Sequence, residues 1–359
     1  MRRDVGMRGT PRAAHIATVA SLTRWKQKLR GITFATGPGR IGLPNPVLIG
    51  RTLLVSTFSP GAIFALDAST GAIRWRTDLG SYGGPAVLDC GPIIVAKTSQ
   101  EILCLDRRTG AVRWSYCPYG RENEHIYSMP IRCGKNVLVA DRGGYVRGFD
   151  LESGAVRFSV NAGRDAQVNS TPAYDGRTAY YSSNAGDVFA LDPKSGAERW
   201  RRGVPGANTR KLLVLGPLLA VATSSGVTFL RRSNGSVHAV WPGGGEVTSA
   251  VVTPHGLLVT CRDERSTRLV ALKSGKVTSE RDLGAPAIDS LRYAPATGLV
   301  YNSRIMGFVI RDAATGAPQW ELTGVADMTA DAEVTRSSIY LLDMRGTVRA
   351  LDHPRKNRT

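Results

Sequence analysis

The chain has 359 residues, a formal net charge of +18 and only five cysteines. No apolar run approaches the roughly 20 residues that a membrane-spanning helix needs, which argues against a helical membrane protein. The cysteine number is odd and no Cys-x-x-Cys pair occurs, so reduced thiols inside a cell are favoured over a disulfide framework. Cys90 and Cys133 each precede a glycine in successive repeats, which leaves a disulfide or a zinc site as the alternative.

Basic residues are concentrated at both ends of the chain. Residues 1–30 carry eight Arg or Lys and one Asp, and residues 353–359 add three more basic residues. We expect basic tails over 1–20 and 354–359, the first of them disordered. These tails predict a weak contact with a polyanion, with plain solvation as the alternative. The apolar stretch 13–20 is short and interrupted by polar residues, so a cytoplasmic location is expected, with export as the alternative.

One stretch, residues 63–75, organises the chain. Ile63 and Ala65 belong to one short alternating run, and Ile73 and Trp75 belong to a second. The sequence Asp67-Ala-Ser-Thr-Gly71 between them has the composition of a turn, since Asp and Thr bond nearby backbone N–H groups and Gly tolerates a positive φ. The stretch therefore predicts a hairpin whose second strand carries a large indole.

This hairpin is repeated along the chain. Counting the first, seven copies have their turn glycines 39 to 44 residues apart, at Gly71, Gly110, Gly154, Gly196, Gly235, Gly275 and Gly316. The copies at Gly235 and Gly275 are weaker. Each period also contains two earlier strand-like runs, and four strands in about 40 residues is typical of a propeller blade.

An eighth blade is expected at the end of the chain, with its outer strand supplied by the N-terminus. Residues 332–352 give three strands and then no fourth, whereas Ser21-Leu-Thr-Arg-Trp25 has the spacing of Gly71 to Trp75. We predict that Thr23–Leu29 pairs with Thr347–Leu351 and closes the ring, which removes the open sheet edges. The fold class is thus an all-β, eight-bladed propeller in a single domain, residues 21–353. The predicted docking residues between blades are Trp25, Trp75, Trp114, Phe158, Trp200 and Trp320.

The pattern Ala-x-Asp-x-x-Thr-Gly-x-x-x-Trp resembles the repeat of quinoprotein (PQQ) type β-propellers, a group that includes quinoprotein dehydrogenases and BamB-like assembly propellers. The resemblance covers residues 21–353 and implies the fold. Quinoprotein dehydrogenases have a vicinal Cys-Cys disulfide and a Glu/Asn/Asp calcium site. No Cys-Cys occurs here and the calcium ligands match no positions, so neither a cofactor nor a metal is expected. BamB-like lipoproteins have a Cys after an apolar signal, whereas the first cysteine here is Cys90.

A propeller places the loops that enter each innermost strand and the hairpin loops between the second and third strands on one face. The entering loops supply Glu124, His125, Tyr127, Asn169, Arg210 and Asp289, and the hairpin loops supply Arg142, Arg262, Arg304 and Arg345. Arginines at such a rim could hold an anionic ligand by bidentate contacts, although exposed loops are polar in any case. His125 lies beside two carboxylates and could act as a general base, or it is only solvated.

Two functions follow from this pattern. The first is a non-catalytic scaffold, monomeric and without a cofactor, that binds a macromolecular partner, expected to be a protein, through its loop face. The alternative is an enzyme or small-ligand protein that uses the channel mouth. Buried, convergent ionisable groups would favour the alternative.

Overall fold

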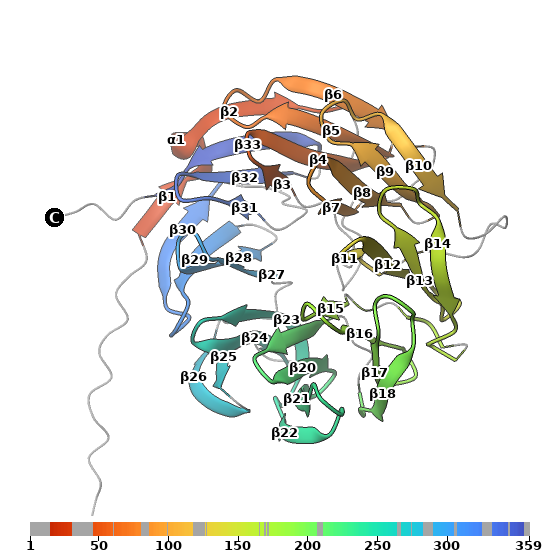
Figure 1. Cartoon of the computed structure of the whole chain (residues 1–359). Helices are drawn as coiled ribbons and strands as arrows, with labels where there is room; N and C mark the ends of the chain where they lie inside the picture. The colour runs from red at the N-terminus through yellow and green to blue at the C-terminus, as the bar shows by residue number, and fades with distance from the viewer. Residues whose placement is uncertain are drawn as a thin grey trace, which may run out of the picture.

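The computed structural model describes residues 15–30, 46–59, 61–79, 86–98, 100–117, 126, 128–164, 166–168, 170, 172–206, 211–263, 267–273, 275–282, 290–304, 307–324, 332–343 and 345–354. Within these ranges the chain forms eight antiparallel sheets arranged as blades around a centre (Figure 1). The predicted fold class, an all-β eight-bladed propeller, is confirmed.

Each blade is formed by four strands, numbered here from the centre outwards. Blades 1 to 4 contain β3 (Val47–Ile49), β4 (Thr52–Phe58), β5 (Gly61–Asp67), β6 (Ile73–Asp78); β7 (Ala86–Asp89), β8 (Ile93–Lys97), β9 (Ile102–Asp106), β10 (Val112–Tyr116); β11 (Ile131–Cys133), β12 (Asn136–Ala140), β13 (Val146–Asp150), β14 (Val156–Val160); and β15 (Ala173–Tyr174), β16 (Ala179–Ser182), β17 (Asp187–Leu191), β18 (Glu198–Gly203).

Blades 5 to 7 follow the same order, and blade 8 uses both ends of the described chain. These blades contain β19 (Leu212–Leu215), β20 (Leu218–Thr223), β21 (Gly226–Arg231), β22 (Val237–Trp241); β23 (Glu246–Thr253), β24 (Gly256–Arg262), β25 (Thr267–Lys273), β26 (Lys276–Asp282); β27 (Ser290–Ala294), β28 (Leu299–Arg304), β29 (Gly307–Asp312), β30 (Pro318–Thr323); and β31 (Glu333–Val334), β32 (Ser338–Leu342), β33 (Thr347–Asp352), with β2 (Thr23–Lys28) outermost.

The ring closes as the sequence predicts. Strand β2 pairs antiparallel with β33, with Trp25 opposite Ala350 and Lys28 opposite Thr347. The Leu29 N–H then donates to the Gly346 carbonyl at 2.8 Å. The predicted pairing of Thr23–Leu29 with Thr347–Leu351 is therefore confirmed.

The segment before β2 differs from the expected disordered tail. Residues His15–Thr18 form β1, which pairs in parallel with β30 of blade 7, and Val19–Leu22 form the single turn α1. Figure 1 shows β1 along the outside of blade 7 and β2 on blade 8. The expectation fails here because the outer edge of β30 has free backbone groups that a short segment can satisfy, and because Val19 is buried in the core between blades 7 and 8.

Local chemistry fixes the repeated turn. The Asp67 carboxylate accepts hydrogen bonds from the backbone N–H groups of Ser69 at 2.8 Å and Thr70 at 3.1 Å. Gly71 has φ = 77°, a value that strains any residue with a Cβ. The same carboxylate pairs with Arg74 at 2.5 Å on the outer strand. This i,i+7 pair recurs as Asp106–Arg113, Asp150–Arg157 and Asp192–Arg199.

The core lies between neighbouring blades, and an aromatic side chain joins most pairs. The Trp75 ring of blade 1 covers Gly110 of blade 2 so closely that a Cβ on the glycine would lie 2.5 Å from the ring. The indole Nε1 donates to the Arg107 carbonyl at 3.0 Å. Trp25, Trp114, Phe158 and Trp200 cover Gly71, Gly154, Gly196 and Gly235 in the same way. Each of these glycines is needed because a ring occupies the space of its side chain.

Trp320 is the exception among the predicted docking residues. It lies on β30 of blade 7, and it packs at the edge of a cluster that contains Ile339 and Leu351 of blade 8. Its ring faces His15 of β1, with the ring centroids 4.9 Å apart. Strand β1 thus provides the contact that a turn glycine provides in most other blades.

Candidate functional site

The predicted loop face is described only in part. The six residues from the entering loops, Glu124, His125, Tyr127, Asn169, Arg210 and Asp289, lie outside the described residues. Arg304 ends β28, and its side chain also lies outside them. The three other arginines, Arg142, Arg262 and Arg345, are described and lie in or beside hairpin loops of the same face.

Two of these arginines sit in turns of the same construction. Arg345 follows Asp343, whose carboxylate accepts the N–H groups of Arg345 at 3.0 Å and Thr347 at 2.8 Å and pairs with Arg349 at 2.7 Å. Arg142 likewise follows Asp141, a buried carboxylate that accepts the Tyr145 N–H and pairs with an arginine six residues later. A buried aspartate therefore anchors each turn and fixes the position from which the arginine extends.

Arg262 is held differently. It ends β24, and its guanidinium pairs with Glu246 at 3.0 Å across the first two strands of blade 6. Its side chain is 27% exposed, so this arginine is committed to its own blade more than to solvent.

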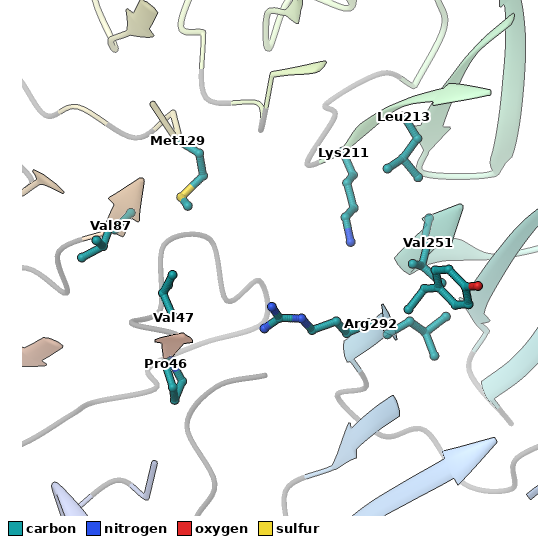
Figure 2. Close-up of a pocket in the computed structure, with 12 residues that line it drawn as sticks. Pro46, Val47, Val87, Met129, Lys211, Leu213, Val251 and Arg292 are labelled. Carbon is teal, nitrogen blue, oxygen red and sulfur yellow. The ribbon is translucent and has the colours of Figure 1, made fainter. Parts of the chain in front are cut away.

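The inner ends of the blades enclose a cavity of about 360 Å³ in the channel. The wall is mostly apolar and comes from blades 1, 2, 5, 6 and 7 and the segment before β11; it includes Pro46, Val47, Val87, Met129, Leu213 and Val251. Two cations, Lys211 and Arg292, point into this space, and Val47, Val87 and Met129 lie on its other side (Figure 2). A cavity of this size with convergent polar groups matches a small-ligand site.

The charge at this cavity is partly balanced. Arg292 donates to Glu333 at 2.5 Å and to the Ala332 carbonyl at 3.0 Å, both in blade 8. Burial raises the pKa of Glu333, and the nearby Arg292 guanidinium opposes that rise. The chemistry available to the wall is therefore electrostatic: two cationic groups could hold one carboxylate or phosphate against an apolar surface.

One further lysine is buried near the channel. Lys97 ends β8 opposite Ala86, which lines the cavity, and its side chain donates to the Ile126 carbonyl at 2.7 Å. Burial lowers the pKa of Lys97 to about 8, because the charged ammonium loses hydration that one carbonyl does not replace.

The sequence analysis did not select Lys211, Arg292 or Lys97. A signal existed for Arg292, because Leu291-Arg-Tyr293 interrupts an innermost strand with a charge. The structural role of Ser128 and Ser170 was also missed. The Ser128 hydroxyl accepts from the Ala140 N–H at 2.7 Å, and the Ser170 hydroxyl accepts from the Ser182 N–H at 3.0 Å, which ties the entering loop to the second strand.

The cysteines and histidines form no metal site among the described residues. No group of three or more His, Cys, Asp or Glu side chains in these ranges could hold a metal ion. All five cysteines are free thiols, and burial raises the pKa of Cys90 to about 11 and that of Cys133 to about 12. The disulfide or zinc alternative for this pair is therefore not what the structure shows.

A family model described as outer membrane protein assembly factor BamB matches residues 59–275. The chain belongs to this family. The BamB of Xanthomonas campestris is 30% identical to it over 146 residues, 41% of this chain and 34% of that protein. The BamB of Yersinia pestis is 24% identical over 170 residues, 46% of this chain and 42% of that one. The matched stretches thus span well under half of these BamB relatives.

Solved structures agree on the fold. The BamB of Moraxella catarrhalis has a TM-score of 0.68 at 17% identity, covering 92% of this chain and 99% of its own. A europium-containing methanol dehydrogenase has a TM-score of 0.70 at 14% identity, covering 89% of this chain and 84% of its own. At these identities the likeness shows the fold alone. Within the described part of this BamB-family chain, no helix is both long and apolar enough to cross a membrane.

Proposed function

We propose that the protein is a non-catalytic scaffold that binds a protein partner through its loop face. The observation that carries the proposal is the pair of aspartate-anchored turns that present Arg142 and Arg345. An anchored turn on a closed ring loses little conformational entropy when a partner binds, so its arginine is pre-organised for recognition. Arg345 is exposed and makes no ion pair with any described side chain.

The relatives support a protein as the partner. They are named for the assembly of outer membrane proteins, a task that one protein carries out on others. The repeated residues of this chain build turns, strands and blade junctions, and the loops carry the variation. A rigid platform with variable loops is a common way to place recognition residues.

The test begins with affinity capture from the source cell and continues with a dissociation constant for the purified pair. Arg345→Glu should weaken binding about tenfold or more, because the reversed charge faces the partner's acidic group. Arg108→Glu is the matched control: Arg108 is also exposed in an aspartate-anchored turn, but on the opposite face. Equal affinity for Arg345→Glu and wild type, with a loss in Arg108→Glu, would place the partner on the other face.

A small anionic ligand in the channel is the second candidate, and the cavity with Lys211 and Arg292 favours it. Native mass spectrometry of the purified protein should then detect a bound anion that Lys211→Met releases. An enzymatic version of this candidate would be supported if His125→Ala abolished turnover of an identified substrate in a folded protein.

We infer a cytoplasmic location from the free thiols, which suit a reducing compartment. Export is the alternative, and the outer-membrane role in the relatives' names favours it. A C-terminal alkaline phosphatase fusion separates the two, because that enzyme gains activity only after export. Weak polyanion binding by the basic termini stays a prediction, since residues 1–14 and 355–359 lie outside the described ranges.

A further inference from the structure

The face opposite the loop face carries two adjoining hollows. One, of about 710 Å³, lies between blades 3 and 4, and the other, of about 490 Å³, lies between blades 4 and 5. Both are lined by Arg177 and Arg199, so they form one continuous depression across the underside of blade 4. We call this depression the turn groove, because turns between first and second strands and between third and fourth strands provide much of its wall.

The turn groove has an excess of positive charge. Its lining contains seven Arg or Lys and three Asp, a net charge of +4 with His238 neutral. Three arginines are neutralised by aspartates of the same groove, in the pairs Arg157–Asp150, Arg199–Asp192 and Arg232–Asp175. The other four cations are exposed and make no ion pair among the described residues: Lys135, Arg177, Lys194 and Arg231.

The excess comes from a local change in the repeat. Four blades place an aspartate at the end of the third strand, as Asp192 ends the run Ala190-Leu191-Asp192 in blade 4. Blade 5 has Leu230-Arg231 instead, so an arginine stands where the repeat has its carboxylate. Its turn is closed by Asn234, whose side-chain oxygen accepts the Ser236 N–H at 3.0 Å. The substitution therefore reverses a charge at the groove without removing the turn.

Apolar surfaces separate the cations. Tyr174 and Pro193 line the first hollow, and Trp200, Pro217 and Leu218 line the second. The Tyr174 hydroxyl donates to the Gly176 carbonyl at 2.7 Å, which holds the ring along the wall. Such surfaces accept side chains, whereas a purely electrostatic surface would not need them.

We propose that the turn groove binds an extended acidic segment of a protein partner. A polypeptide with spaced carboxylates can reach Arg177, Lys194 and Arg231 while its other side chains contact the apolar wall. Its backbone N–H groups can donate to the carboxylates of the groove. A nucleic acid presents a phosphate at every nucleotide and would meet those same carboxylates unfavourably. This site goes beyond the loop-face proposal, because it lies on the other side of the ring.

The test uses the full chain and fluorescence anisotropy. The probe is a short fluorescein-labelled peptide in which glutamate alternates with serine, and the comparison is a single-stranded oligonucleotide of the same net charge. The groove variant is Arg177→Glu with Lys194→Glu. The matched control is Arg51→Glu with Arg108→Glu, since Arg51 follows Gly50 as Arg177 follows Gly176, and Arg108 has the place of Lys194 in its turn. Both variants keep the same basic termini.

The groove variant should weaken peptide binding about tenfold or more, and the control by less than about twofold. Arg231→Asp restores the residue that the repeat has elsewhere, and it should also weaken binding while the melting temperature stays unchanged. Arg345→Glu on the loop face should leave peptide binding as it is, which separates this result from the first proposal. The idea is overturned if the control loses as much, if wild type binds no peptide, or if the oligonucleotide binds more tightly and loses affinity in the groove variant.

Discussion

The indole of Trp25 lies directly on Gly71, so that a Cβ at Gly71 would come within 2.6 Å of the ring, and its Nε1 donates to the Ala68 carbonyl at 3.1 Å. Trp25 belongs to the outer strand of blade 8 and Gly71 to the turn of blade 1. This contact therefore joins the last blade to the first with the same geometry that Trp75 and Gly110 use within the ring. Closure reuses the ordinary junction between blades.

The first prediction concerns the two parts of the N-terminal segment. Deleting residues 1–29 removes β2 and Trp25, which exposes the edge of β33 and opens the junction with blade 1, so aggregation or a large fall in melting temperature is expected. Deleting only residues 1–18 removes β1 and should leave the protein folded, because β2 still closes the ring. Gel filtration and thermal melts of both truncations give the answer. A monomeric 1–29 deletion with an unchanged melting temperature would contradict the closure model.

The second prediction compares two glycines. Gly91 and Gly110 both have positive φ, 90° and 74°, so alanine strains the backbone at either position. A Cβ at Gly91 meets nothing within 4 Å, whereas one at Gly110 meets the Trp75 ring. Gly110→Ala should therefore cost about 1–3 kcal/mol more than Gly91→Ala in urea unfolding. Equal losses would mean that the aromatic cover is not tight.

The third prediction concerns Lys97 and alkaline pH. Its folded pKa of about 8 lies below the model value of 10.5, so between these values the unfolded state binds a proton that the folded state does not. The free energy of unfolding should rise with pH across this window. Lys97→Met should flatten the rise, while Lys194→Met, at an exposed site, should not. Denaturant midpoints from pH 7 to about 10.5 measure the difference, and identical slopes in all three proteins would argue against a buried ammonium.

The fourth prediction concerns acid and the turn pairs. The hydrogen bond from Arg199 is the largest of several effects that lower the pKa of Asp192 to about 2, so this carboxylate stabilises the fold above its unfolded pKa and loses that effect as the pH falls to about 2. Asp192→Asn should reduce the loss of stability between pH 4 and 2. Arg199→Gln should do the same, because it removes the partner. If neither variant changes the acid limb of the stability curve, the pair contributes nothing measurable, as many surface pairs do.

The fold was predictable because its determinants are local. Asp67 bonds the N–H groups two and three residues ahead, and the same residue types recur at a fixed period, so the turns could be found without any long-range information. Strand β1 was not predictable for the opposite reason. His15–Thr18 is short, carries no alternating pattern, and forms a strand only because β30 lies beside it, some 300 residues away along the chain.

The site was predictable only to the level of a face. Topology indicates which loops share that face, and it placed Arg142, Arg262 and Arg345 there. It does not indicate that Arg262 pairs with Glu246, nor that Lys211 and Arg292 converge on one cavity. Those relationships depend on how far neighbouring blades rotate about the ring axis, and a one-dimensional repeat pattern does not contain that angle.

The junctions around blade 6 have a consequence for motion. Gly275 of blade 6 is covered by Ala239 of blade 5, where other junctions have an aromatic ring, and Gly316 of blade 7 is covered by Leu269. A methyl group removes much less apolar surface from water than an indole does. Blade 6 is therefore held by the weakest side-chain contacts, and its amide hydrogens should exchange with solvent faster than those of blades 1 and 2. The ring has a preferred place at which to loosen, far from the seam where its ends meet.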